Sequence, residues 1–401
     1  MGETRGTEPS RRGRVVRVRT CTHFLKGIFV AILRRILRVL GWGATILLVG
    51  AFLVGYAAPY LPPAYFWWTN LFAVPLVPLA GLVGLLGLGL VGRGVSQRAW
   101  GWVAVGGVLL GLVGVRFGPS VWSGVASVNS EETLRLMSFN VPMTFGRRDA
   151  SARALTRFVE RASPDVVAFQ ESWMSTKDNP WPGREAHPWP PRLFLEDIGY
   201  SPPRAHPRDT MICQPVLGRV PLDSIGLRSL PPHTNRCGHY TRTQFRWGKR
   251  AVVLYNIHLH TIGSVRPWKE AGRWGSLEQW GAFVQDYWRG MLYRAQQARR
   301  IRRHIEQETR PVLVVGDFNS TPHQWAYRHL AQELQSVHAR GTWGWGGTFP
   351  ARRPVVQIDH ILVGPAWEVV GARVPALSHS PPISDHRPIV ARLRWATDYS
   401  E

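Results

Sequence analysis

The stretch PVLVVGDFNSTP, at positions 311–322, joins a continuous apolar run to an acid and an amide. A short apolar run bounded by Pro and Gly is typical of a buried strand. Asp317 and Asn319 follow this run on one side of an extended segment. The stretch therefore predicts a buried strand that ends at a polar rim.

Five other segments show the same pattern, an apolar and β-rich run bordered by polar residues. They lie at 133–141, 164–172, 251–260, 355–363 and 389–395. Apolar residues recur at helical spacing in two of the intervening segments, so amphipathic helices are expected there. Strands that alternate with helices predict an α/β or layered α+β domain.

The first third of the chain differs in composition from the rest. The whole chain has 49 Lys and Arg against 26 Asp and Glu, a net charge of +23, yet residues 39–130 contain no acid. The runs 39–58, 66–91 and 99–115 are about as long as the ~17–25 residues that cross a bilayer. An all-α transmembrane region of about three helices is therefore expected at 39–117, in preference to a buried helical core of a soluble domain.

The segments that flank this region predict its orientation. Residues 1–38 form a basic tail, in which 24–38 is either an amphipathic helix on the membrane surface or an extension of the first span. Basic residues in this tail and at Arg93 and Arg98 belong on the cytoplasmic side. Three crossings then place the large domain outside a multi-pass cell-membrane protein, after a linker at 118–133; if the third run does not cross, that domain stays in the cytoplasm.

The three cysteines agree with this orientation without proving it. Cys21 would lie in the reducing cytoplasm, whereas Cys213 and Cys237 share the large domain and could pair in an oxidising compartment. Sequence spacing does not decide whether these two cysteines pair, so both states stay open at this point.

Polar residues at the strand ends form a chemically coherent set. Strand ends of an α/β sandwich converge on one rim, so residues far apart in the sequence can share a site. Carboxylates and amides are hard oxygen donors suited to Mg²⁺ or Mn²⁺, and imidazoles can donate to phosphate oxygens or move protons. The set comprises Asn140, Glu171, His258, Asp317, Asn319, Asp359, Asp385 and His386.

The order of these motifs, over roughly 134–395, resembles the endonuclease/exonuclease/phosphatase superfamily. That superfamily includes DNase I-like nucleases, apurinic-site endonucleases, neutral sphingomyelinases and inositol polyphosphate 5-phosphatases. The resemblance implies a DNase I-like four-layer α/β sandwich that hydrolyses phosphoesters with a divalent metal. The motifs that carry it are Asn140, Gln170-Glu171, His258, Gly316-Asp317-Phe318-Asn319, Ile358-Asp359 and Ser384-Asp385-His386.

The resemblance also implies roles for the site residues. The metal set is Asn140, Glu171 and Asp385, which hold Mg²⁺ or Mn²⁺, and no other cofactor is implied. The attacking water and the phosphate are oriented by Asp317 and Asn319. The remaining catalytic residues are the pair Asp359 and His386 and the second histidine, His258.

Three functions are compatible with these observations. The first is a membrane-anchored, metal-dependent phosphodiesterase of nuclease type, and the second applies the same chemistry to a phospholipid headgroup or another small phosphoester. The third is a non-enzymatic membrane interaction module, which is disfavoured because every polar position of the motifs is filled. The loop 261–281 interleaves tryptophans with basic residues, which can stack bases, contact lipid headgroups, or simply pack against each other.

Overall fold

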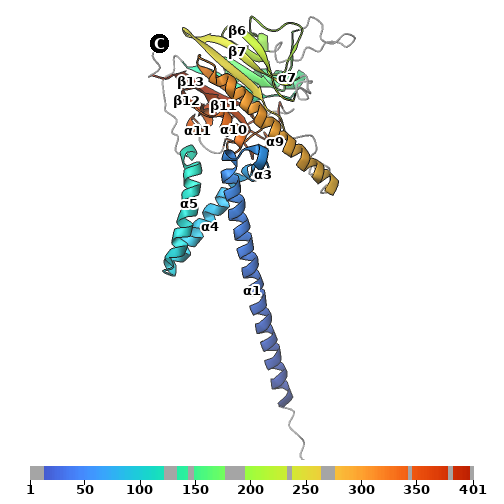
Figure 1. The fold of residues 1–401 in the computed structure, drawn as a ribbon, viewed down its shortest axis with the longest axis vertical. Helices are drawn as coiled ribbons and strands as arrows, with labels where there is room; N and C mark the ends of the chain where they lie inside the picture. The colour runs from blue at the N-terminus through green and yellow to red at the C-terminus, as the bar shows by residue number, and fades with distance from the viewer. Residues whose placement is uncertain are drawn as a thin grey trace, which may run out of the picture.

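The computed structural model of the chain consists of a helical stalk and a sandwich-shaped head (Figure 1). Most of the linker expected at 118–133 and most of the loop 261–281 lie outside the described residues. The structure describes residues 13–121, 133–142, 149–176, 195–232, 237–262, 276–341, 346–377 and 383–397.

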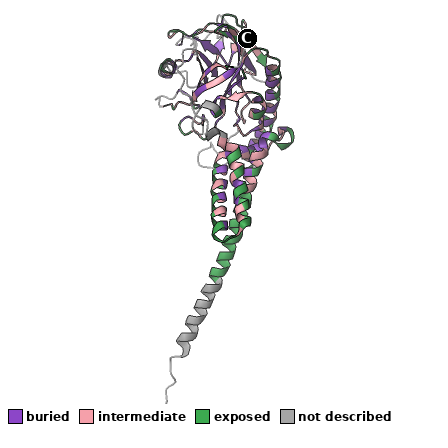
Figure 2. Ribbon diagram, turned by 90° about the vertical axis from the view of Figure 1, so that its left-hand side faces the viewer, coloured by how far each residue is buried: buried purple, intermediate pink, exposed green. Residues whose placement is uncertain are grey.

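The stalk contains three helices long and apolar enough to cross a membrane, at Phe29–Tyr60, Leu76–Ser96 and Trp100–Gly118. The stalk helices are largely exposed (Figure 2). Apolar side chains such as Ile46 and Val115 are among the exposed residues. Large exposed apolar faces are unfavourable in water and favourable in lipid. The stalk therefore has the three candidate spans that the sequence predicts.

The helices of the stalk differ in two details from the expected segments. Residues 24–38 continue into the first span within a single helix, as an extension of that span. The second span begins only at Leu76, because Pro75 and the residues before it interrupt the expected run 66–91. The elements are α1 (Gly13–Ala57), η1 (Ala58–Tyr60), α2 (Pro63–Phe66), α3 (Thr69–Ala73), α4 (Leu76–Ser96) and α5 (Trp100–Val121).

Two mixed sheets form the centre of the head. The first has the strand order β12-β13-β1-β2-β5 and the second the order β10-β11-β9-β8-β7-β6. Facing apolar residues of the two sheets, such as Leu136 and Leu313, form the core between them. The strands are β1 (Leu134–Asn140), β2 (Val166–Gln170), β5 (Val216–Gly218), β6 (Leu222–Ser229), β7 (His239–Trp247), β8 (Arg250–His258), β9 (Val312–Asp317), β10 (Gln335–Ser336), β11 (Asp359–Val363), β12 (Trp367–Arg373) and β13 (Ile389–Trp395). A separate pair contains β3 (Met174–Ser175) and β4 (Met211–Ile212).

Helices cover the outer faces of both sheets. On the first sheet, α7 (Asp149–Ala162) packs Leu155 and Val159 against strand residues. On the second, α9 (Leu277–Glu306) and α10 (Trp325–Leu330) bury an equivalent stripe, and α11 (Val337–Gly341) lies near β11. The order helix, sheet, sheet, helix confirms the four-layer sandwich.

The structure also answers the question about the cysteines of the head. Cys213 and Cys237 form a disulfide, with their Cα atoms 5.5 Å apart. The bond links the segment just before β5 to the segment just before β7. A disulfide of this kind persists in an oxidising compartment, which matches the outside location that the sequence favours for the head.

Candidate active site

Four strands bring the first site residues to one edge of the sandwich. Strands β1 and β2 run parallel, so Asn140 lies opposite Gln170 and Glu171 follows directly. Strands β8 and β9 are also parallel, and His258 lies opposite Asp317. Because the carboxyl ends of all four strands meet at this edge, residues from two sheets face each other there.

The backbone beside the site takes positive φ angles at three positions: 138° at Gly316, 55° at Glu171 and 46° at Asn319. A Cβ atom on Gly316 would lie 1.8 Å from the carbonyl oxygen of Ile257, so only glycine lets β9 approach β8 this closely. At the two other residues a positive φ costs about 1–3 kcal/mol, which the surrounding structure must offset. Such conformations gather at functional sites, which makes this edge the candidate active site.

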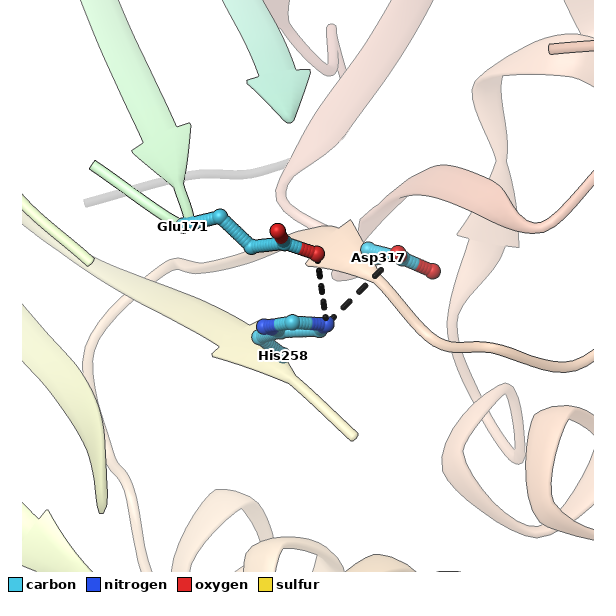
Figure 3. Close-up of side chains that lie close together, drawn as sticks. All are labelled: Glu171, His258 and Asp317. Carbon is cyan, nitrogen blue, oxygen red and sulfur yellow. Dashed lines mark ion pairs between the residues drawn. The ribbon is translucent and has the colours of Figure 1, made fainter. Parts of the chain in front are cut away.

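Glu171, His258 and Asp317 form a first group, the glutamate cluster. The Nε2 atom of His258 lies 3.6 Å from Oε1 of Glu171 and 3.7 Å from Oδ2 of Asp317 (Figure 3). The three side chains offer ligand atoms that all lie within 4.8 Å of one another. This spacing allows the glutamate cluster to hold a metal ion.

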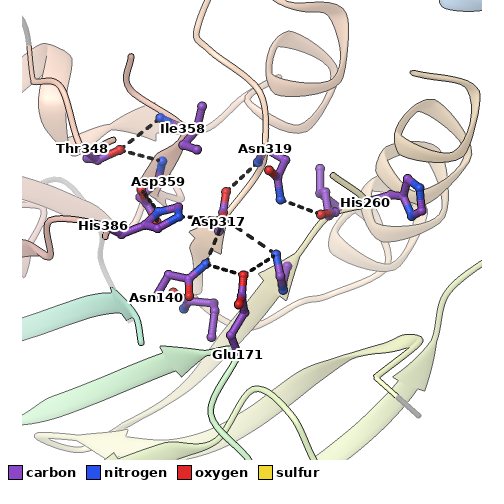
Figure 4. A network of polar contacts seen from close by, with 12 residues as sticks. Asn140, Glu171, His260, Asp317, Asn319, Thr348, Ile358, Asp359 and His386 are labelled. Atoms are coloured by element: carbon purple, nitrogen blue, oxygen red, sulfur yellow. Dashed lines mark hydrogen bonds and ion pairs between the residues drawn. The ribbon is translucent and has the colours of Figure 1, made fainter. Parts of the chain in front are cut away.

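Asp317 also belongs to a second group, the aspartate cluster of Asp317, Asp359 and His386. The Nδ1 atom of His386 lies 2.9 Å from Oδ2 of Asp359, and its Nε2 atom lies 3.9 Å from Oδ2 of Asp317 (Figure 4). The hydroxyl of Thr348 accepts hydrogen bonds from the backbone N–H groups of Ile358 and Asp359, which fixes the start of β11. Asp359 thus holds the Nδ1 side of the His386 ring, and the Nε2 side points toward Asp317 at the centre of the site.

Charge interactions set the protonation of the aspartate cluster. Burial alone would lower the pKa of His386, but the carboxylates of Asp359, Asp317 and Asp385 together raise that pKa to about 10. Burial and the neighbouring Asp359 raise the pKa of Asp317, while His386 and His258 act in the opposite direction. At neutral pH His386 is therefore an imidazolium that faces the site.

Two of the three predicted residues outside the clusters, Asn319 and Asp385, line the cleft at this edge. The cleft has a volume of about 670 Å³, and Glu171, His258 and His386 also line it. The backbone N–H of Asn319 donates to Oδ1 of Asp317 at 2.8 Å, which orients that carboxylate. Asp385 is exposed on the wall and lies outside both clusters. The structure thus brings all eight predicted side chains to one edge, with Asp385 at its margin.

Asn140 provides the test of whether these residues suit a metal ion. Its Nδ2 atom donates to Oε1 of Glu171 at 3.2 Å and to Oδ2 of Asp317 at 3.0 Å. Its Oδ1 atom is buried and has no hydrogen-bond partner among the described residues. A buried oxygen without a partner costs about 1–3 kcal/mol, and a cation would relieve that cost. Amide and carboxylate oxygens are also the donors that hard divalent cations prefer, so the residues fit such an ion.

Sequence reasoning missed two polar residues that border the site. Arg294 on α9 is 1% exposed and donates through Nη1 to the carbonyl oxygen of Asn319 and to the hydroxyl of Ser320. Thr348 fixes the start of β11, as described above. In the sequence Arg294 is one of many arginines on a long helix, and only its burial distinguishes it. No sequence signal marks Thr348.

The comparison with known proteins identifies the family of the chain. Residues 137–386 match the Endonuclease/Exonuclease/phosphatase family, and because this match spans more than half of the sequence, the chain belongs to that family. The family consists of phosphoester hydrolases with a DNase I-like fold, and the chain is an enzyme of this class. No curated protein matches the sequence.

Solved structures of low identity resemble the head. An endonuclease/exonuclease/phosphatase from Beutenbergia cavernae is 19% identical, covering 66% of this chain and 72% of that chain, with a TM-score of 0.46. One from Bacteroides vulgatus is 17% identical, covering 66% and 99%, with a TM-score of 0.45. The 3′ phosphatase NExo from Neisseria, bound to a product DNA hairpin, is 13% identical, covering 65% and 100%, with a TM-score of 0.43.

Proposed function

We propose that the protein is a membrane-anchored phosphodiesterase that depends on a divalent metal, Mg²⁺ or Mn²⁺. The observation that supports this most strongly is that Asp317 belongs to both clusters while the buried Oδ1 of Asn140 lacks a partner among the described residues. One edge of the sandwich thereby combines a metal-binding group with a charged imidazole. Hydrolysis of an anionic ester requires both, because carboxylates alone would repel the substrate.

Glu171 of the glutamate cluster and Oδ1 of Asn140 would hold the ion, and Asp385, at the margin of the site, is proposed as a further ligand. When bound, a divalent cation polarises the phosphoryl oxygens and lowers the pKa of a water molecule. Asp317 and Asn319 orient the attacking water, whose oxygen forms a new bond to phosphorus. The water gives up one proton as this bond forms, the ester P–O bond on the opposite side breaks, and the leaving oxygen gains a proton and departs as an alcohol.

The two histidines complete this assignment. His386, charged and held by Asp359, donates a hydrogen bond to a phosphate oxygen and stabilises the negative charge of the transition state. His258 is placed between Glu171 and Asp317, where its Nε2 atom can donate to the phosphate or pass a proton. The site thus contains donors for the phosphate as well as ligands for the ion.

We divide the chain into four regions, with the bounds that the sequence predicts. Residues 1–38 are the basic cytoplasmic tail, 39–117 the transmembrane region, 118–133 the linker and 134–395 the catalytic domain. Arg93 lies near the tip of the α4–α5 hairpin, at the end of the stalk opposite to the head (Figure 1). Together with the basic tail and the disulfide of the head, this supports an extracytoplasmic catalytic domain.

Hydrolysis of bis(p-nitrophenyl) phosphate by the full-length protein in detergent tests the proposed function. Activity should require Mg²⁺ or Mn²⁺ and disappear with a chelator. Glu171→Gln should lower kcat/KM by about 10²–10⁴-fold, whereas Glu160→Gln, at an exposed position of α7, should leave it unchanged. Full activity in the chelator, or in Glu171→Gln, would contradict the proposal.

A further inference from the structure

The catalytic cleft extends from the site residues to the stalk. Val74, which ends α3 between the first two candidate spans, lines the same cleft as Glu171 and His386. Next to it, Trp67 packs on Tyr287 of α9 with ring centroids 6.3 Å apart. The connection between two membrane helices therefore forms part of the wall of the cleft.

Further contacts hold the head against the same end of the stalk. The guanidinium carbon of Arg328 lies 4.1 Å from the ring centroid of Tyr60, at the end of the first span. The ring of His323 lies 5.2 Å from that of Phe117, at the end of the third. The head is thus seated on the ends of two spans as well as on the connection between them. This arrangement keeps the mouth of the cleft at the level of the membrane surface.

Exposed apolar side chains lie on two segments that also contribute residues to the wall of the cleft, α9 and the connection between the first two spans. The N-terminal half of α9 projects from the head (Figure 1). Its exposed apolar residues follow helical spacing, and Leu277 is 93% exposed; on α2, Tyr65 is 78% exposed. Trp and Tyr are typical of the membrane–water interface. We call this surface the membrane-facing rim; it consists of Tyr65, Phe66, Trp68, Leu71, Leu277, Val284 and Trp288.

The cleft wall near the rim contains buried polar atoms without a partner among the described residues. They are the hydroxyl of Tyr287 and the Nε and Nη2 atoms of Arg294, two side chains that lie on one face of α9. Both side chains are at least nine-tenths buried. A guanidinium and a phenol directed into one cleft are suited to an anionic oxygen, such as that of a phosphate.

The charge of the cleft bears on whether the substrate is a nucleic acid strand or a single phosphate attached to a hydrocarbon group. Among the described residues that line it, Arg294 is the sole Arg or Lys, and the apolar residues of the lining include Val74, Ile262 and Val356. Binding of a nucleic acid strand depends on several cationic contacts to successive phosphates. Besides His386, the described lining thus holds one cationic side chain, which suits a single phosphate attached to a hydrocarbon group better than a strand of successive phosphates.

We propose that the substrate is a phospholipid of the bilayer that anchors the enzyme, with its acyl chains at the membrane-facing rim and its phosphate between Arg294 and the metal-binding edge. This inference rests on the proposed function and specifies its substrate. Water adds its oxygen to the lipid phosphorus and one of the two ester P–O bonds breaks. The products are either diacylglycerol and a phosphorylated headgroup, or phosphatidate and the free headgroup alcohol.

The test uses the full-length protein reconstituted into vesicles of phosphatidylethanolamine and phosphatidylglycerol with Mn²⁺. Parallel reactions contain bis(p-nitrophenyl) phosphate or a single-stranded oligonucleotide. We expect diacylglycerol or phosphatidate to accumulate, Glu171→Gln to abolish that accumulation, and the oligonucleotide to remain intact. Cleavage of the oligonucleotide with intact lipid, or of the soluble diester alone, would overturn the phospholipid assignment and leave the proposed function standing. Failure with all substrates would instead overturn the proposed function.

Two variants separate the rim and the cleft wall from the chemistry. Val284→Glu places a charge on the rim, so the ratio of lipid to soluble-diester turnover should fall by about tenfold. Gln296→Glu adds the same charge to an exposed position further along α9 and should keep the ratio of the wild type. Tyr287→Phe should raise KM for lipid by about fivefold with little change in kcat. Equal ratios in Val284→Glu and the wild type would contradict the role of the rim.

Discussion

At the scale of single residues, the site depends on side chains that have two partners each. Asp317 belongs to both clusters, and Asn140 donates to a carboxylate of each strand pair. The sequence predicted these residues because each ends an apolar run. It did not predict Arg294, because only the fold brings this buried side chain into contact with Asn319 and Ser320.

Replacement of Asp359 tests whether its carboxylate keeps His386 charged. Asp359→Asn removes the carboxylate that contributes most to raising the pKa of His386, so that pKa should fall from about 10. The imidazolium would then be lost as the pH rises through a lower range, and kcat should decrease by about 10²–10⁴-fold. NMR titration of the histidine and the pH–rate profile measure both effects. An unchanged titration in Asp359→Asn would show that Asp359 does not set the charge of His386.

At the scale of elements, apolar runs predicted the six strands β1, β2, β8, β9, β11 and β13 of the head, whereas β5, β6, β7 and β12 were not predicted. Strand β9 and its neighbours follow continuous apolar runs, which are typical of strands buried on both faces. The start of the second span was less predictable, because Pro75 interrupts a segment that is apolar throughout. The docking of α9 on Trp67 could not be predicted, since neither segment has a pattern that specifies its partner.

Replacement of Gly316 tests whether the close approach of β8 and β9 requires a glycine. Gly316→Ala places a methyl group against the carbonyl oxygen of Ile257 and strains the backbone, so β8 and β9 must separate. We expect a loss of at least about 1–3 kcal/mol in the free energy of unfolding, with reduced activity. Thermal unfolding of the full-length protein in detergent measures the loss. Gly226→Ala is the control, because its added methyl would meet no atom closer than 4.0 Å; equal stability of the two variants would contradict the argument.

At the scale of the whole molecule, the stalk contributes to the wall of the cleft. Three candidate spans end where the head is seated, and the cleft opens at that end. Composition alone predicted the spans, because residues 39–130 contain no acid. The shared wall between stalk and cleft could not be predicted, because it joins Val74 to residues of the head that lie far along the chain.

Reporter proteins fused to the C-terminus test the orientation of the protein in the membrane. Three crossings with a cytoplasmic N-terminus place the C-terminus outside. Alkaline phosphatase fused to the C-terminus, which needs an oxidising compartment, should be active in a bacterial host, and a fluorescent protein that folds only in the cytoplasm should be dark there. The opposite pair of results would show that the third helix does not cross and that the head is cytoplasmic.

Manganese binding to the full-length protein is the decisive measurement, because the proposed active site holds one divalent ion among side chains from both sheets. Electron paramagnetic resonance should detect tight Mn²⁺ binding by the wild type. Glu171→Gln should weaken that binding by at least about tenfold, and Glu160→Gln should leave it unchanged. If Mn²⁺ binds equally to the wild type and to Glu171→Gln, the ion is held elsewhere and the proposed active site is wrong.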